Sequence, residues 1–153
     1  MKIVFQFSWL KKGAPVRRGF KVSGAYELVS EYAERIQKFS PCAMDGFTEK
    51  SPTASRSSAV LWVCDRGKGA VTLSSEQLAE RLDRVLSGGA RELHIVIGGA
   101  DGFSEAGMAR MAPDLRWSFG PMTLPHELAA VVAAEQMYRA WTILKGLPYH
   151  SGH

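Results

Sequence analysis

Short runs of apolar residues, each followed by glycine, charged or loop-forming residues, are the main feature of most of the chain. The run AVLWVC at Ala59–Cys64 is apolar throughout, and LHIVI at Leu93–Ile97 leads directly into Gly98. Continuous apolar runs of this length are typical of strands covered on both faces, as in a parallel sheet. We therefore expect strands at Lys2–Trp9, Ala59–Cys64, Leu93–Ile97 and Leu115–Phe119, and a weaker strand at Cys42–Phe47.

Helical periodicity separates these runs. Within Ala25–Phe39 the apolar positions follow helical spacing, at Leu28, Val29, Tyr32, Ile36 and Phe39. Ser74 and Gln77 form the sequence pattern of a capping box and predict a helix that ends near Gly88. Ser104 is expected to cap a shorter helix that runs through Met111. Alternating strands and helices predict the α/β class, with a mostly parallel sheet flanked by helices.

The last predicted helix, Glu127–Lys145, is hydrophobic around most of its circumference. At about 100° per residue, Glu135, Arg139 and Thr142 fall within an arc of roughly 60°, and nearly every other direction is apolar. One side of such a helix can pack on the sheet, and the opposite side needs another cover. We hypothesise that the same helix of a second subunit covers it in a two-fold homodimer. The i, i+4 pair of Glu135 and Arg139 is either purely structural or leaves Arg139 able to reach a substrate.

Two loop regions complete the pattern. Lys11–Gly24 holds five Lys or Arg residues and no acid, and it is either a solvated loop or a phosphate-contacting loop. Ser40–Ser58 is rich in Pro, Ser and Thr and predicts mostly loop. The glycine after Ile97 lies where open parallel sheets bind ligands, since ligands collect beyond the carboxyl ends of the strands.

Composition narrows the class of protein. A chain of 153 residues is expected to form one domain over residues 1–153. A net charge of +4 and a pI near 9.2 favour an anionic partner such as nucleic acid only weakly. Cys42 and Cys64 lack metal-site spacing, so we expect no metal and no disulfide framework. No apolar run approaches the ~18 residues of a membrane span, and we expect a cytoplasmic protein with no membrane partner.

Four short motifs occur in the last third of the chain: IGGADG at 97–102, MTLPH at 122–126, EQMYRAW at 135–141 and PYH at 148–150. In this order and spacing they resemble the ribosomal RNA large subunit methyltransferase H family, small members of the SPOUT superfamily of S-adenosylmethionine-dependent RNA methyltransferases. The resemblance implies a SPOUT-type α/β fold with a C-terminal trefoil knot. It also implies a homodimer that methylates N3 of a pseudouridine in large-subunit rRNA at the subunit interface.

The resemblance assigns cofactor contacts as well. Carried over position by position, the contacts to S-adenosylmethionine fall on Cys64, Gly98, Phe119, Gly120, Pro121, Met122, Thr123 and Leu124. The chain departs from the family at Cys64, where leucine is usual, at Pro121, and at the FSW sequence of the first strand, where a small glycine-bearing sequence is usual. Neither GxGxxG nor GxxxxGK[ST] occurs, which disfavours a dinucleotide site and an NTPase.

Methylation at N3 requires that a proton leaves, so a base or a charge stabiliser is needed nearby. The candidates are Arg139, His126, Tyr149 and His150, the last two on a tail that could reach across a dimer. His126 could instead cap or pack the helix start. Two other functions stay open: a non-catalytic, ribosome-associated RNA-binding protein that retains the fold, and a small-molecule nucleotide-binding enzyme. Free rRNA and the assembled ribosome are both possible substrates.

Overall fold

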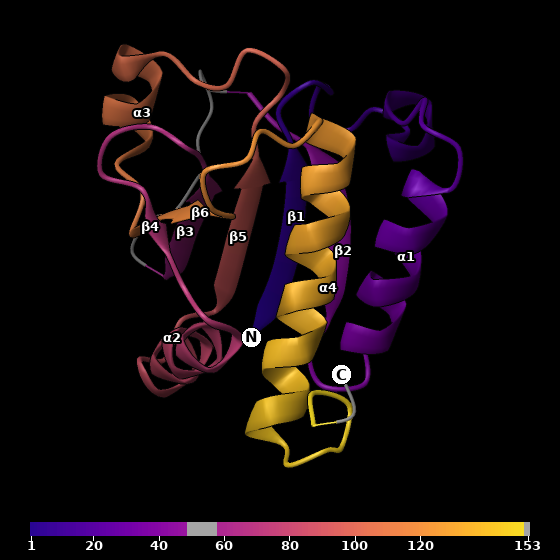
Figure 1. The fold of residues 1–153 in the computed structure, drawn as a ribbon, viewed down its shortest axis with the longest axis vertical. Coiled ribbons are helices and arrows are strands. Elements are labelled where there is room, and N and C mark those ends of the chain that lie inside the picture. Colours follow the sequence, from indigo (N-terminus) through magenta and orange to yellow (C-terminus); the bar gives the residue numbers. More distant parts are fainter. Residues whose placement is uncertain (49–57, 152–153) are drawn as a thin grey trace.

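The computed structural model describes residues 1–48 and 58–151. Their strands form one six-stranded sheet in the order β2-β1-β5-β3-β6-β4, in which every neighbouring pair is parallel. The strands are β1 (Lys2–Phe7), β2 (Cys42–Gly46), β3 (Ala59–Cys64), β4 (Val71–Thr72), β5 (Glu92–Ile97) and β6 (Leu115–Ser118). Because all strands run in one direction, their carboxyl ends meet at one edge of the sheet, at the top of Figure 1.

The predicted strands are confirmed, including the weaker one, which forms β2. The AVLWVC run has the bounds of β3, and β1 ends at Phe7, two residues before the predicted end. We did not predict β4, because its two residues are exposed and form no apolar run. Within the segment predicted as mostly loop, residues 49–57 lie outside the described part of the chain.

The α-helices follow the predicted order, and a 3-10 helix that we did not predict lies within Lys11–Gly24, which we expected to be loop. They are the 3-10 helix η1 (Val16–Gly19) and the α-helices α1 (Ala25–Ile36), α2 (Ser75–Ser87), α3 (Glu105–Met111) and α4 (His126–Leu144). The capping box of α2 is present, with the Gln77 N–H donating to the Ser74 hydroxyl at 3.1 Å and the Ser74 N–H donating to Gln77 Oε1 at 2.8 Å. The Ser104 hydroxyl caps α3.

The helices divide unequally between the two faces of the sheet. Alternate strand residues such as Phe5 and Ile95 point to one face, where they pack with α1, α2 and α4 in the larger core cluster. The opposite residues, such as Val63 and Val96, pack with Met108 and other side chains of α3 in a smaller cluster. Figure 1 shows α4 lying between α1 and α2 on the first face. The central helix is therefore covered on three sides within one chain.

That placement explains how α4 is buried. Ala130, Ala133, Ala134, Met137 and Ala140 are fully buried. Small side chains allow the helix axis to come close to the sheet. Its flanks are covered by α1 and α2, so only a narrow outer strip remains, on which Leu128 is 43% exposed. The side of α4 away from the sheet, which we expected a second subunit to cover, is thus partly covered by α1 and α2 of the same chain.

Two expectations for side-chain faces were wrong. Thr142 was expected on the polar arc of α4, but it is fully buried, because the chain after α4 turns back and Leu147 N–H donates to the Thr142 carbonyl at 2.9 Å. Leu28 was expected in the core, but its position on α1 leaves it 44% exposed. No helix in the described ranges 1–48 and 58–151 is long and apolar enough to cross a membrane.

Candidate functional site

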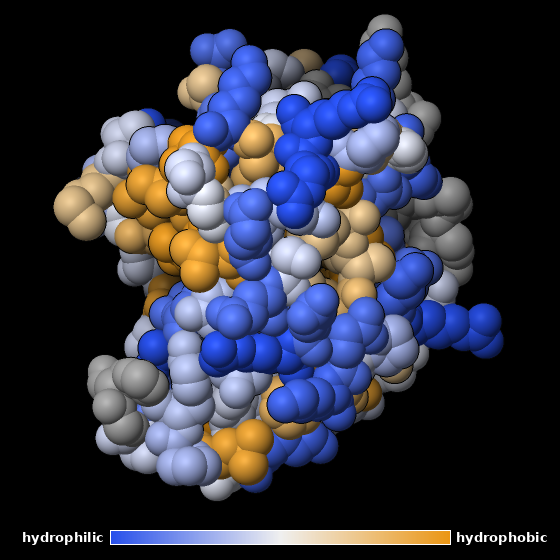
Figure 2. Space-filling model, turned by 90° about the vertical axis from the view of Figure 1, so that its right-hand side faces the viewer, coloured by the Kyte–Doolittle hydropathy of each residue, from blue (hydrophilic) through white to orange (hydrophobic). Residues whose placement is uncertain are grey.

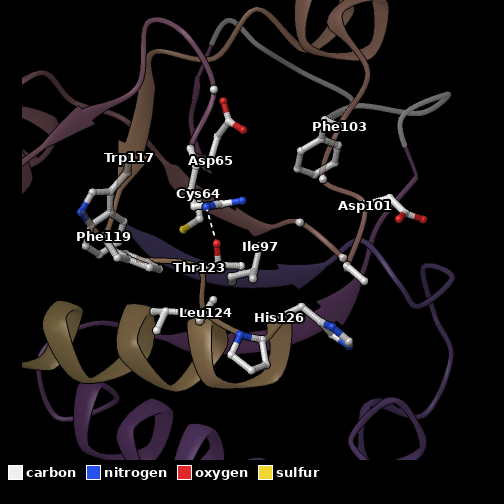
Figure 3. A pocket seen from close by; sticks show the side chains of 18 of the residues that line it. Cys64, Asp65, Ile97, Asp101, Phe103, Trp117, Phe119, Thr123, Leu124 and His126 are labelled. Carbon is white, nitrogen blue, oxygen red and sulfur yellow. Dashed lines mark hydrogen bonds between the residues drawn. The ribbon is translucent and has the colours of Figure 1, made fainter. Parts of the chain in front are cut away.

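A cavity of about 770 Å³ lies at the carboxyl edge of the sheet, beyond the ends of β3, β5 and β6. The loops that follow these three strands surround it, and the first turn of α4 closes one side (Figure 3). Its walls are formed by Cys64, residues 65–67, residues 97–103, Trp117, Phe119, residues 122–126 and Ala129. Its volume is within the range of about 300–1,000 Å³ that is typical of small-molecule sites.

The loop after β5 approaches its neighbours closely because it begins with two glycines. A Cβ atom at Gly98 would lie 3.1 Å from Phe103 Cε2, and one at Gly99 would lie 3.6 Å from Ser8 Oγ. Gly102, at φ +66°, donates its N–H to the Gly99 carbonyl at 3.0 Å and closes a tight turn. A left-handed φ favours glycine, so backbone rather than side chains forms this wall.

Ion pairs and hydrogen bonds join the loop after β3 to the β6 strand and its loop. Asp65 Oδ2 accepts from Arg116 Nη2 at 2.5 Å and from Arg116 Nε at 3.1 Å. Arg66 Nη1 donates to Thr123 Oγ1 at 2.7 Å, the dashed line that ends at Thr123 in Figure 3. Burial raises the pKa of the Cys64 thiol, and the adjacent Asp65 charge adds to the effect. Cys64 is therefore a neutral wall of the cavity and no nucleophile.

The loop after β6 is positioned by an aromatic contact and a left-handed turn. The Trp117 and Phe119 rings pack edge to face at 4.8 Å, and Gly120 has φ +103°. Of the eight residues predicted to contact a cofactor, six line the cavity: Cys64, Gly98, Phe119, Met122, Thr123 and Leu124. The cavity lining does not include Gly120 or Pro121, although they belong to the same loop.

His126 lies at the junction of this loop and α4 and also lines the cavity. Its ring packs edge to face on the Trp9 indole, with ring centroids 4.5 Å apart, and its Nε2 is 4.0 Å from Glu127 Oε2. The packing role that we left open for His126 is therefore present. His126 thus both packs on Trp9 and forms part of the cavity wall.

The other three predicted catalytic residues form a separate cluster. Arg139 Nη2 donates to Glu135 Oε2 at 2.8 Å, and the Tyr149 hydroxyl donates to the same oxygen at 2.7 Å. Arg139 Nη1 lies 3.0 Å from His150 Nδ1, while His150 Nε2 lies 2.5 Å from Glu76 Oε1 of α2. The tail after α4 is thus fixed on α4 and α2.

The environment of this cluster sets its charge states. The hydrogen bond with Glu135 raises the pKa of Arg139, which remains a cation. Burial, then the hydrogen bond to Glu135, raises the pKa of Tyr149, so its phenol stays protonated at neutral pH. A protonated phenol donates hydrogen bonds and cannot accept a proton as a phenolate.

The cluster and the cavity lie toward opposite ends of α4. His126 borders the cavity, and Arg139 lies 13 positions further along the helix, which at 1.5 Å per residue is about 20 Å. One chain therefore does not bring Arg139, Tyr149 and His150 to the cavity. Only His126, of the four candidates, lies beside it.

The cavity combines apolar side chains, exposed backbone and acidic groups at its rim, an arrangement that suits a ligand with both an aromatic and a polar part. Among residues 1–48 and 58–151, no group of three His, Cys, Asp or Glu side chains could hold a metal ion.

Comparison with known proteins identifies the family. The model described as predicted SPOUT methyltransferase matches residues 20–150. The chain belongs to the SPOUT methyltransferase family. A ribosomal RNA large subunit methyltransferase H from Deinococcus radiodurans is 38% identical over 130 residues, which cover 80% of this chain and 86% of that protein.

Other relatives of this SPOUT chain match over shorter stretches. Proteins with the same name are 49% identical over 80 residues in Acidithiobacillus ferrooxidans and 47% identical over 100 residues in a Psychrobacter species. These matches cover 52% and 65% of the chain and 48% and 58% of the relatives, so the chain spans about half the length of these relatives. A solved methyltransferase structure from Legionella pneumophila with bound SAM gives a TM-score of 0.49 at 13% identity, covers 92% of this chain and 66% of that one, and is too distant to add to the assignment.

Sequence reasoning missed several residues of the SPOUT cavity. Asp65, Arg66, Asp101 and Phe103 line it, yet none was predicted. Asp65 and Arg66 directly follow the predicted strand end at Cys64, and Asp101 lies inside the IGGADG motif. Their position just beyond strand ends is the signal that could have identified them.

Proposed function

We propose that the chain is an S-adenosylmethionine-dependent methyltransferase that modifies large-subunit rRNA at N3 of a pseudouridine. The cavity at the carboxyl edge carries the proposal, because three separate loops bring together six of the eight positions that the resemblance assigns to the cofactor. The names of the relatives support the rRNA substrate. The N3 position rests on the family resemblance.

The residues of the cavity fit this cofactor. The bare backbone at Gly98 leaves space that a side chain would fill, and Leu124, Ile97 and Phe119 provide apolar surfaces for an adenine ring and a methionine chain. S-adenosylmethionine, when bound, supplies a methyl carbon that the sulfonium has already made electrophilic. The chain's own residues then have to bind the donor, exclude water and align the nucleophile.

The cluster around Arg139 supplies groups suited to the uridine-type ring. As N3–H loses its proton, negative charge develops on the ring, and the Arg139 guanidinium can neutralise it. Tyr149, which stays protonated, can donate a hydrogen bond but cannot take the proton. His150 Nδ1 faces Arg139 Nη1, which can only donate, so this ring nitrogen can accept the proton once that contact opens. His126, at the cavity itself, is the alternative acceptor.

A homodimer would unite the two halves of this site. Within one chain the cluster is about 20 Å along α4 from the cavity. The outer strip of α4 carries Leu128, 43% exposed, with Val131 and Val132 half-buried, and hydrophobic surface is visible on the left of Figure 2, the side where α4 lies. Antiparallel packing of this strip on its copy would place the Arg139 end of one helix beside the cavity end of the other.

Complementation tests the shared site. At a cofactor concentration well below the wild-type Kd, Gly98→Val is expected to leave the cavity almost empty, and Arg139→Ala removes the charge stabiliser. In a co-folded mixture, half of the dimers are mixed and each has one intact site, so about a quarter of wild-type activity should return. A mixture as inactive as its parents would place both groups in the same subunit, and a monomeric mass by sedimentation at micromolar concentration would exclude the dimer.

The proposal also includes the trefoil knot. The loop after β6 lines the same cavity as the loop after β5 and continues directly into α4, so the C-terminal segment passes beside an earlier loop, as a knot requires. Pulling on both termini should give an unfolded length shorter than the full extension of about 3.3–3.6 Å per residue. We assign the protein to the cytoplasm, which the two free, buried cysteines support.

Methyl transfer tests the main proposal. The protein is incubated with radiolabelled S-adenosylmethionine and with ribosomes, or naked rRNA, from a strain that lacks this modification, and the labelled nucleoside is identified by mass spectrometry. We expect label at N3 of one pseudouridine. Cofactor binding without transfer to either substrate would contradict the enzymatic function, and RNA binding without cofactor would favour the non-catalytic RNA-binding protein.

A further inference from the structure

A second feature of the carboxyl edge lies outside the cavity. Residues 11–24, which we call the basic loop, follow β1 and carry five Lys or Arg residues with no acid. The loop lies at the upper right of Figure 1, beside the amino-terminal end of α1. A solvated loop would need no support from the rest of the fold, so its contacts decide what it is.

Side chains from two strand ends hold the basic loop in place. The Trp9 indole N–H donates to the Gly19 carbonyl at 2.8 Å, and the Asp45 carboxylate at the end of β2 accepts from the Gly13 N–H at 2.9 Å. Phe20 packs edge to face on Phe7 of β1 at 5.2 Å. These contacts fix the beginning and the middle of the loop.

A buried carboxylate fixes the end of the loop. Glu127, in the first turn of α4, has a side chain only 7% exposed, and its Oε1 accepts the N–H groups of Lys21 at 2.9 Å and Val22 at 2.8 Å. A buried carboxylate is costly unless it is hydrogen-bonded, and bonds of this kind are about twice as strong as neutral ones. We call these two hydrogen bonds the Glu127 clamp. Because the neighbouring residue His126 lines the cavity, the Glu127 clamp fixes the loop relative to the cavity.

Four of the five cations of the basic loop have no ion pair among the described residues. Lys11, Lys12, Arg18 and Lys21 are exposed, and none has an ion pair within residues 1–48 and 58–151. Arg17 alone is paired, 3.3 Å from Glu27. Figure 2, which faces this side, shows strongly hydrophilic side chains projecting from its upper part.

The basic loop is continuous with the cavity. A Cβ atom at Gly99 would lie 3.7 Å from Trp9 Cβ, and the Trp9 ring packs on His126. Trp9 therefore contacts the cavity wall on one side and the loop, through Gly19, on the other. The four free cations belong to the same edge of the molecule as the cavity.

We propose that the basic loop is a preformed docking surface for the sugar-phosphate backbone of the RNA substrate, with Lys11, Lys12, Arg18 and Lys21 as phosphate contacts and Glu127 as the positioning residue. The identity of the RNA rests on the proposed function. Phosphate contacts position a nucleic acid without reading its sequence. Holding the loop backbone in one arrangement before binding lowers the ordering cost of association.

Steady-state methyl transfer and filter binding to large-subunit rRNA test the surface. In Lys11→Ala/Lys12→Ala/Arg18→Ala, we expect the KM and Kd for RNA to rise about 10- to 100-fold, because three phosphate contacts are lost. The slope of log Kd against log salt should fall by about 2–3. The kcat and the Kd for S-adenosylmethionine should stay at wild-type values, since none of the three residues lines the cavity.

A matched control removes the same charge elsewhere. Lys38→Ala/Arg81→Ala/Arg84→Ala also removes three cations, none of which has an ion pair in the described chain, from α2 and the turn after α1. This control should bind RNA like the wild type. Equal losses of RNA affinity in both variants would show that only net charge matters and would overturn the proposal. No loss of RNA affinity in the basic-loop variant would overturn it as well. Filter binding needs no turnover, so it separates failure of this surface from failure of the methyltransferase function.

Discussion

The two ends of α4 are built in different ways. At the His126 end, the cavity is formed largely by backbone, by glycines such as Gly98 and by apolar side chains. At the Arg139 end, a network of charged and polar side chains is joined by hydrogen bonds of 2.5–3.0 Å. The His126 end therefore provides a shaped binding surface, and the Arg139 end provides charged groups and hydrogen-bond donors.

Under the proposed mechanism, cofactor binding and proton chemistry take place at opposite ends of this helix. Within one chain, a substitution at either end changes a set of contacts that does not include the other end, since the two are about 20 Å apart. Substitutions at the Arg139 end should therefore change kcat and leave cofactor affinity alone, and substitutions at the cavity should do the opposite.

The largest effect is expected at the Arg139 end. In Arg139→Ala, kcat should fall about 10²- to 10³-fold, the usual loss when one stabilising donor is removed from a developing anion. The Kd for S-adenosylmethionine, measured by calorimetry, should not change. Arg139→Lys keeps the charge without the planar fork and should restore part of kcat. An unchanged kcat in the alanine variant would remove Arg139 from the chemistry.

The converse change is made at the cavity. In Gly98→Val, the added side chain meets the Phe103 ring, because even a Cβ would lie 3.1 Å from it. Overpacking of about 1–3 kcal/mol should weaken cofactor binding roughly 5- to 150-fold. Gly99→Ala is the control, since its Cβ would make ordinary contacts at 3.6–3.7 Å. Equal affinity in the two variants would show that close approach at Gly98 does not shape the site.

The sequence predicts local features of the fold well and contacts between distant residues poorly. Element order follows from hydrophobic period, which is local, and for that reason β3 and the capping box of α2 agree closely with the prediction. Carry-over from the family placed six of its eight cofactor positions in the cavity lining, because those positions lie just beyond strand ends. Neither the Glu127 clamp on Lys21, 106 positions apart, nor the burial of Thr142 leaves a periodic signal, since both depend on where the chain returns after a turn.

The clamp connects the cavity end of α4 to the basic loop and should give an intermediate effect. In Glu127→Ala, the N–H groups of Lys21 and Val22 lose their acceptor, at a cost of about 1–3 kcal/mol in the free energy of unfolding. We expect the KM for RNA to rise roughly tenfold from the displaced loop, with kcat unchanged. Glu127→Gln keeps an acceptor oxygen and should recover most of the KM. Stability loss without any change in KM would make Glu127 a structural residue only.

The smallest effect is expected from Tyr149→Phe. Burial and the hydrogen bond to Glu135 hold the pKa of Tyr149 above its usual value of 10, so the neutral phenol persists as the pH rises through the range in which an ordinary tyrosine ionises. Loss of the hydrogen bond to Glu135, worth about 0.5–1.5 kcal/mol, should lower kcat roughly 2- to 12-fold at every pH from 7 to 10. The pH profile of kcat should keep its shape, because its ionisations belong to other groups. If a basic limb disappears from the profile of the variant, Tyr149 does ionise during turnover, and the Arg139 end contains a second proton-transfer group rather than a fixed hydrogen-bond donor.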